Sequence, residues 1–330
     1  VDAAAIAAAA ALLLATFGGT ILHRRRYLAL MFAGVAGLMV VLAFVRFGAP
    51  DLALTQLSVE VVTIVLFLLM LRFVPAEALP ETGGRAWRDA AIAGVAGCAT
   101  AALVYAMLTR PLETISGFHV ENAIPGGGGT NIVNVILVDF RGFDTLGEIA
   151  VLAMAAFGVH AMLGGLRLVP YAKRSVDTPD RHPVMLAMLM RPLLPLALAV
   201  SIFVLLRGHN LPGGGFIAGL VAAVAVMLQY LAGGIDFAAS RIRIDYVRMV
   251  AAGLAVAVAT GLGSWLFGRP FMTSTFGYVD PPLVDKFEVA SAMAFDLGVF
   301  VVVLSGILLV LSELGSLSRR ERDAATGGRR

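Results

Sequence analysis

The sequence contains 330 residues, of which 59% are hydrophobic and 14% are charged, and its mean hydropathy is +0.89. Soluble globular domains carry about 25% charged residues, so this composition excludes an ordinary soluble protein. The pI of about 9.3 would suit nucleic-acid binding, but the basic residues are spread over separate loops and form no single patch, which excludes nucleic acid as a partner.

Apolar segments of about 20 residues recur along the whole chain, and a helix of that length crosses the ~30 Å hydrocarbon core of a bilayer. We therefore predict an all-α polytopic membrane protein with about nine transmembrane helices. The predicted helices are residues 2–22, 27–47, 52–73, 89–109, 146–168, 184–206, 214–234, 246–268 and 288–312.

Lysine and arginine are shared unevenly between the two sets of alternating loops. If the loop at residues 23–26 is cytoplasmic, its set contains 19 of the 25 basic residues. Basic residues accumulate in cytoplasmic loops, so the N-terminus is predicted outside and the C-terminus in the cytoplasm. The chain begins with valine and has no basic segment before its first apolar run. We therefore expect no signal peptide and regard the chain as part of a longer polypeptide.

A long external segment, residues 110–142, separates the fourth and fifth predicted helices. The sequence PGGGG (125–129) indicates a flexible break, and the apolar run TNIVNVILVDF (130–140) follows it. We interpret this run as a short helix at the outer membrane interface. A β-strand is the alternative, because periodicity does not separate the two in so short a run.

A charged, proline-containing segment, RLVPYAKRSVDTPDRHP (167–183), divides the chain. Prolines and opposite charges without an apolar face are typical of a linker. Residues 1–170 are predicted to form a five-helix block, residues 171–183 a cytoplasmic linker, and residues 184–330 a four-helix block.

Small residues recur at four-residue spacing in two predicted helices, as Gly94 with Cys98 and Gly215 with Gly219. Small residues let helices approach closely in lipid, so these positions are predicted to pack against other helices. The segment RGHNLPGGGFIAGL (207–220) is predicted to be a structural turn, with His209 and Asn210 able to cap the following helix.

Signatures of catalysis and of cofactor binding are missing from the sequence. It contains no H-E-x-x-H, C-x-x-C or G-x-S-x-G motif, and no lysine follows a glycine as a phosphate-binding loop requires. Its single cysteine excludes a cysteine metal cluster. We predict that the protein is not an enzyme and has no metal and no cofactor.

The remaining candidates are ionisable residues inside the apolar segments, where a charge costs about 2.5–3.5 kcal/mol on insertion scales. Glu60 is the foremost of them. Gln56, Glu60 and Thr63 follow i, i+4, i+7 spacing and place a polar stripe on one helix face. Such a stripe suits a proton or cation path. The alternative is a neutral glutamic acid that hydrogen-bonds a neighbouring helix.

Glu148 and His160 lie on the fifth predicted helix, residues 146–168. Thr145 precedes Glu148 by three residues, the spacing of a capping box with Thr145 as N-cap. Capping and ion entry are both open for Glu148. His160 lies twelve residues further on, about 18 Å deeper, so only a water chain would link it to Glu148. His160 is either a proton relay or a hydrogen-bonded packing residue.

Asp296 lies midway along the last predicted helix and is the fourth ion-path candidate. Asp285, eleven residues earlier, has nearly the same angular position, so an acidic line would lead inward from the outer surface. The alternative is a solvated rim around Asp285.

Four segments resemble parts of the multisubunit Na⁺/H⁺ antiporters of the Mrp (Mnh) type. FGAPDLALTQLSVEVVTIVLFLL (47–69) and VNVILVDFRGFDTLGEIAVLA (133–153) resemble the C-terminal region of the large A subunit. RGHNLPGGGFIAGL and FDLGVFVVVLSGILLVLSEL (295–314) resemble the B subunit. The resemblance covers essentially the whole chain, in two blocks, and indicates a fusion of these two subunits. The acids of the family's "TQL.VE" and "DT.GE" motifs fall on Glu60 and Glu148.

The resemblance implies a multi-pass protein of the bacterial plasma membrane, in a complex that exchanges Na⁺ for H⁺. The implied partners are the antiporter-like half of the A subunit and the C, D, E, F and G subunits, within the lipid bilayer. The alternatives are a membrane-arm subunit of an energy-converting hydrogenase or complex I-like machine, and a non-conducting scaffold subunit.

Overall fold

The computed structural model describes residues 3–71, 83–111, 113–164, 184–241, 244–279 and 287–327. Within them each predicted apolar segment forms a long helix, which confirms the class of an all-α polytopic membrane protein. Seven of the described helices are long and apolar enough to cross a membrane, whereas the apolar parts of two others are shorter, Ala5–Ile21 and Gly215–Tyr230. The long helices are α1 (Ala3–Ile21), α2 (Arg26–Arg46), α3 (Pro50–Met70), α4 (Gly83–Thr109), α7 (Gly142–Gly164), α8 (Val184–Arg207), α9 (Gly215–Arg241), α10 (Tyr246–Gly263) and α11 (Ser291–Gly327).

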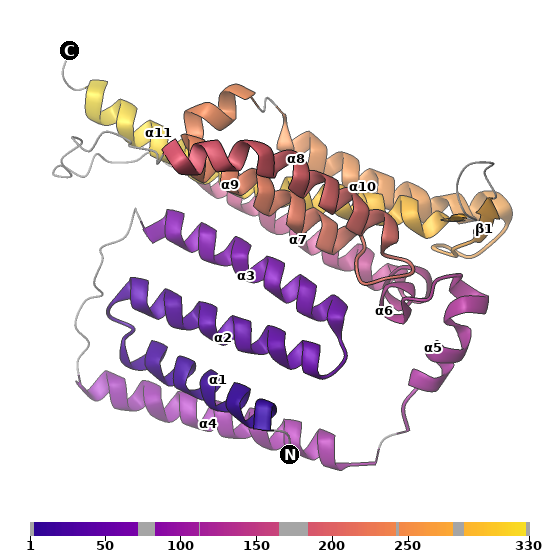
Figure 1. The fold of residues 1–330 in the computed structure, drawn as a ribbon, viewed down its shortest axis with the longest axis horizontal. Coiled ribbons are helices and arrows are strands. Elements are labelled where there is room, and N and C mark those ends of the chain that lie inside the picture. Colours follow the sequence, from indigo (N-terminus) through magenta and orange to yellow (C-terminus); the bar gives the residue numbers. More distant parts are fainter. Residues whose placement is uncertain are drawn as a thin grey trace.

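Apart from α4, the long helices form two groups: a row of α1, α2 and α3, and a bundle of α7 to α11. Figure 1 shows α1, α2 and α3 side by side, with α3 against the bundle of α7 to α11. Inside the bundle α11 contacts α7, α9 and α10, and α8 packs on α9. The packing crosses the predicted boundary between the blocks, because α3 contacts α9 and α7 contacts α10 and α11. The predicted linker, 171–183, lies outside the described residues.

The core of the bundle is apolar and contains many small residues. Ile149 and Ala153 of α7 and Val302 of α11 belong to one buried cluster. A Cβ atom on Gly219 of α9 would lie 2.9 Å from Val303 Cβ, and one on Gly215 would overlap the Asp296 backbone. Both glycines therefore face α11 of the same chain at close range, as helix packing in lipid favours.

Helix α4 stands apart from this packing. From Gly84 to Thr109 its residues are exposed except for half-buried Ala106. The predicted packing stripe of Gly94 and Cys98 therefore meets no other helix in the described part of the chain; a Cβ atom on Gly94 would find nothing within 4 Å, and Cys98 is exposed.

Short helical turns fill most of the segment between α4 and α7. They are α5 (Ser116–Asn122), the π-helical turn η2 (Ala123–Gly127), α6 (Ile132–Val135) and the π-helical turn η3 (Ile136–Phe140). Asn131 is the N-cap of α6, where its side chain accepts from the backbone N–H of Asn134. The helical interpretation of residues 130–140 is confirmed and the β-strand alternative is wrong.

A two-stranded hairpin follows the turn η4 (Ser264–Phe267) and was not predicted. Strands β1 (Phe276–Val279) and β2 (Phe287–Ala290) pair antiparallel. The Thr275 N–H donates to Ser291 Oγ at 3.0 Å and the Ser291 N–H donates to the Thr275 carbonyl at 2.9 Å, so the hairpin leads directly into α11. The prediction that the last helix begins at residue 288 is wrong, because strand pairing satisfies the backbone up to Ala290.

Candidate functional site

A cavity of about 290 Å³ lies where the row of helices meets the bundle. We call it the polar cavity, because three carboxyl side chains and an asparagine line it among apolar groups. No lysine or arginine is among its lining residues in the described part of the chain. These residues are Asp51, Leu52 and Thr55 of α3; Val133, Asn134, Leu137 and Val138 of the 130–140 segment; Thr145 and Glu148 of α7; Gly213 to Ile217 around the start of α9; and Asp296 and Val299 of α11.

Asp51, in the first turn of α3, joins three parts of the chain. Its buried side chain accepts through Oδ1 from the Gly213 N–H at 2.9 Å and from Asn131 Nδ2 at 3.3 Å. Asn131 Nδ2 also donates to the carbonyls of Gly208 and Leu211, at 3.0 and 3.1 Å. Because buried polar groups are stable only when they are hydrogen-bonded, this network fixes the glycine loop against α3 and α6.

Asp296, predicted as an ion-path residue, lies buried at the polar cavity and does not face lipid. Its Oδ2 accepts from Asn134 Nδ2 at 3.4 Å, and the Gly215 N–H also donates to the carboxylate. Gly214 has φ +102°, and a Cβ there would lie 2.6 Å from Asn134 Nδ2, so glycine is required at this crossing. Asp285, the predicted outer end of an acidic line, lies outside the described residues.

A buried histidine and aspartate lie behind the polar cavity. His209 Nε2 is 2.9 Å from the Gly127 carbonyl and 3.6 Å from Asp139 Oδ2, with side chains 8% and 3% exposed. Both groups interact electrostatically with Asp296. Since a carbonyl oxygen only accepts, His209 carries a proton on Nε2. One protonatable ring and two carboxyl groups are thereby gathered in one buried region.

The prediction that His209 and Asn210 cap α9 is wrong. The His209 ring turns toward Gly127, and Asn210 accepts at its carbonyl from the Thr130 hydroxyl at 2.8 Å and at Oδ1 from the Thr130 N–H at 3.2 Å. Both residues therefore bind the 127–130 segment of the first block. The α9 turn is held instead by Asp51 through the Gly213 N–H.

Glu148 is exposed at the polar cavity, and its predicted capping box is wrong. Helix α7 begins at Gly142, so Thr145 lies inside the helix, and its hydroxyl donates to the Leu137 carbonyl at 2.7 Å. The first turn of α7 starts earlier than predicted because it follows η3 with only Arg141 between them. Glu148 is thus left available to the polar cavity.

Glu60 does not reach the polar cavity. It lies nine residues from Asp51 on α3, hence about 13 Å along the helix and on the opposite face. Its half-buried carboxyl group packs on α2, where a Cβ atom at Gly37 would overlap it. Gln56 and Thr63 are half-buried on the same helix. Glycine on α2 therefore makes the room for this acid, and the structure separates Glu60 from Glu148 and Asp296.

His160 pairs with a residue that the sequence did not indicate. Its Nδ1 is 2.7 Å from Glu313 Oε1 on α11, and its side chain is 46% exposed. The two residues are 153 positions apart, so no local spacing points to the pair. Its buried neighbours Ala153 and Ala156 on α7 belong to the apolar core, and they separate His160 from Glu148 near the start of the helix.

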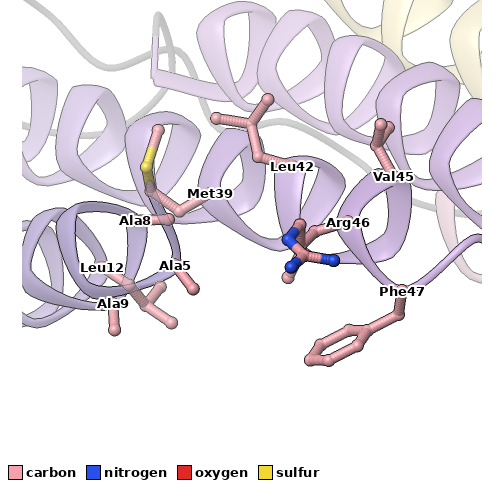
Figure 2. Close-up of a pocket in the computed structure, with 10 residues that line it drawn as sticks. Ala5, Ala8, Ala9, Leu12, Met39, Leu42, Val45, Arg46 and Phe47 are labelled. Atoms are coloured by element: carbon pink, nitrogen blue, oxygen red, sulfur yellow. The ribbon is translucent and has the colours of Figure 1, made fainter. Parts of the chain in front are cut away.

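A second, apolar cavity of about 440 Å³ lies between α1 and α2 (Figure 2). Arg46 is the single charged residue among its lining residues in the described part of the chain, and none of those lining residues carries a carboxyl side chain. Figure 2 shows the Arg46 side chain among alkyl and aromatic groups. The described residues bring three carboxyl side chains to the polar cavity and none to this one, so the polar cavity is the candidate site. In the described residues no group of three or more histidine, cysteine or acidic side chains is placed so that it could hold a metal ion.

Comparison with known protein families divides the chain into three consecutive matches. Residues 185–309 match the model described as "Domain related to MnhB subunit of Na+/H+ antiporter". Residues 84–183 match the model of the E subunit of MBH, and residues 11–76 match that of the D subunit of MBH.

Individual relatives extend this result. The chain is 44% identical over 327 residues to the probable K⁺/H⁺ antiporter A/B subunit of Rhizobium meliloti (strain 1021), covering 89% of this chain but only 32% of that protein. It is 41% identical over 118 residues to the Na⁺/H⁺ antiporter B subunit of Bacillus subtilis (strain 168), covering 36% of this chain and 82% of that protein. A solved structure of the Mrp complex from Dietzia sp. DQ12-45-1b is similar with a TM-score of 0.86 and 34% identity, over 96% of this chain and 35% of that chain. The chain therefore belongs to the family of multisubunit Na⁺/H⁺ antiporter subunits, as a chain related to the A and B subunits.

Proposed function

We propose that the chain is a membrane subunit of a multisubunit monovalent cation/proton antiporter in the bacterial plasma membrane, and that the polar cavity is part of its ion path. The observation that carries the proposal is the gathering of Asp51, Glu148 and Asp296 around one cavity without a basic lining residue in the described part of the chain. Ionisable groups at membrane depth are costly, and they are typical of ion pathways.

The proposal includes the organisation of the chain in the membrane. Nine spans, an outside N-terminus and a cytoplasmic C-terminus agree with the loop charges. Residues 1–170 form the part similar to the A subunit and residues 184–330 the part similar to the B subunit. The partners are the antiporter-like half of the A subunit and the C, D, E, F and G subunits, with Na⁺ or K⁺ exchanged for H⁺. The exposed side chains of α4 supply an apolar surface for such partners.

Asp296→Asn tests the polar cavity directly. We expect cation-driven proton movement in everted membrane vesicles to fall to about a tenth of wild type or lower, because the amide keeps the shape of the side chain but removes its charge. The control is Asp245→Asn, since Asp245 is exposed at the N-cap of α10, where asparagine also caps, and does not line the cavity. Wild-type transport by a fully assembled Asp296→Asn complex would remove the cavity from the ion path.

Glu60→Gln tests whether the ion path also includes Glu60, which lies outside the polar cavity. Glu60 packs on Gly37 at a distance from the cavity, so we expect the variant to assemble normally while transport decreases. Transport and the amount of assembled complex are measured in the same vesicles. If the variant transports like wild type, Glu60 is a packing residue between α2 and α3.

A scaffold role is the second candidate, favoured by the close contacts of Gly215 and Gly219 with α11. Amide substitutions of Glu60, Glu148 and Asp296 together would then spare transport. Copurification distinguishes the hydrogenase-like alternative from the antiporter, because redox subunits would purify together with the chain only in a hydrogenase-like complex.

A further inference from the structure

We propose that the polar cavity binds one partly hydrated alkali cation, with Asn134 Oδ1 and the Asp296 carboxylate as its protein ligands. This inference deepens the proposed function and rests on it, because it names the atoms that hold the ion within the proposed path.

The first observation is an unsatisfied oxygen. Asn134 is 5% exposed and lines the polar cavity, and its Oδ1 is buried without a hydrogen-bond partner in the described part of the chain. Its Nδ2 donates to Asp296 Oδ2 at 3.4 Å, which orients the amide and leaves the oxygen without a partner among the described residues. Buried amide oxygens are rarely left without a partner, so a missing ligand at this atom is expected.

The neighbouring Asn131 differs from Asn134, because all its side-chain polar atoms have hydrogen-bond partners. Asn131 uses Nδ2 for Asp51, Gly208 and Leu211, and its Oδ1 accepts from the Asn134 N–H as the cap of α6. Both polar atoms of the Asn131 side chain are therefore satisfied within the protein. Of these two asparagines, only Asn134 presents a buried acceptor that the fold does not use.

The chemistry of the lining selects a hard cation. Its polar side chains offer carboxyl, amide and hydroxyl oxygens, which suit alkali and alkaline-earth ions better than transition metals. No close group of three acidic or histidine ligands occurs in the described residues, so the tight cage that a divalent ion prefers is not present there. A volume of about 290 Å³ leaves room for an ion with several waters, at about 30 Å³ of liquid per water.

Equilibrium binding of ²²Na⁺ to the purified, assembled complex tests the site. Asn134→Leu removes the oxygen at similar volume, and we expect the loss of one bound cation per complex or an affinity about tenfold weaker. Asn134→Asp keeps an oxygen at the same position and is expected to bind the cation at least as tightly. The control is Asn122→Leu, since Asn122 lies on α5 and does not line the cavity.

The outcomes separate this inference from the proposed function. Wild-type affinity and stoichiometry in Asn134→Leu and Asp296→Asn alike would overturn the site, even if Asp296→Asn abolishes transport and the path is retained. Loss of the bound cation in Asn134→Leu with normal transport would support the site and reject the path. Should Asn134→Leu fail to assemble, Asn134→Asp and Asp296→Asn decide the question by the same measurement.

Discussion

Asp51→Ala is expected to lower the stability of the folded chain by roughly 3 kcal/mol, because hydrogen bonds to a buried charged acceptor are worth about 1.5–3 kcal/mol each. The substitution removes the acceptor of the Gly213 N–H and one acceptor of Asn131, both of which are buried. The glycine loop would then be released from α3. The measurement is the thermal midpoint of the purified complex, together with the amount of assembled complex in the membrane.

Asp51→Asn is the matched variant for this prediction. Its amide oxygen can still accept from the Gly213 N–H, so we expect most of the stability to return. Asp144→Ala, at an exposed aspartate of α7, is expected to change the midpoint little, since surface charges contribute at most about 1 kcal/mol. Equal thermal midpoints for Asp51→Ala and wild type would show that apolar packing alone holds the glycine loop against α3.

Gly215→Val is expected to prevent formation of the native bundle. A side chain at this position overlaps the Asp296 backbone, and backbone atoms in a packed helix do not move aside as a flexible side chain does. The α9–α11 contact would have to open, which costs more than the roughly 1–3 kcal/mol typical of overpacking. We expect little or no assembled complex, measured by gel filtration of detergent-solubilised membranes.

The control for Gly215→Val is Gly158→Val on α7. A Cβ atom at Gly158 meets nothing within 4 Å, so the same change of residue type tests helix propensity without overlap. Normal amounts of assembled Gly215→Val complex would mean that α9 and α11 do not approach each other as closely as the structure shows.

The proposed site was only partly accessible from the sequence. Asp296 and Glu148 stand out because each is an acid in an apolar run, and insertion cost makes such residues conspicuous. Asp51, Asn131 and Asn134 were missed, because an acid at the start of a helix and asparagines in a loop have ordinary capping roles. No sequence pattern indicates the hydrogen bond from the Gly213 N–H to Asp51, since the two residues are 162 positions apart.

The amino-acid sequence by itself determined the membrane class, the approximate positions of the long helices and the small residues on α9, but not the first residues of α7 and α11. These features follow from local quantities: the length of apolar segments, the charges between them and the spacing of glycines. Tertiary structure alone decided that Glu60 faces Gly37, that His160 pairs with Glu313, and that Asp51 meets the glycine loop. Each of these contacts joins residues on different helices, and a helix-by-helix pattern carries no information about which faces meet. The polar cavity exists because helix packing brings α3, α7 and α11 together around the loop before α9.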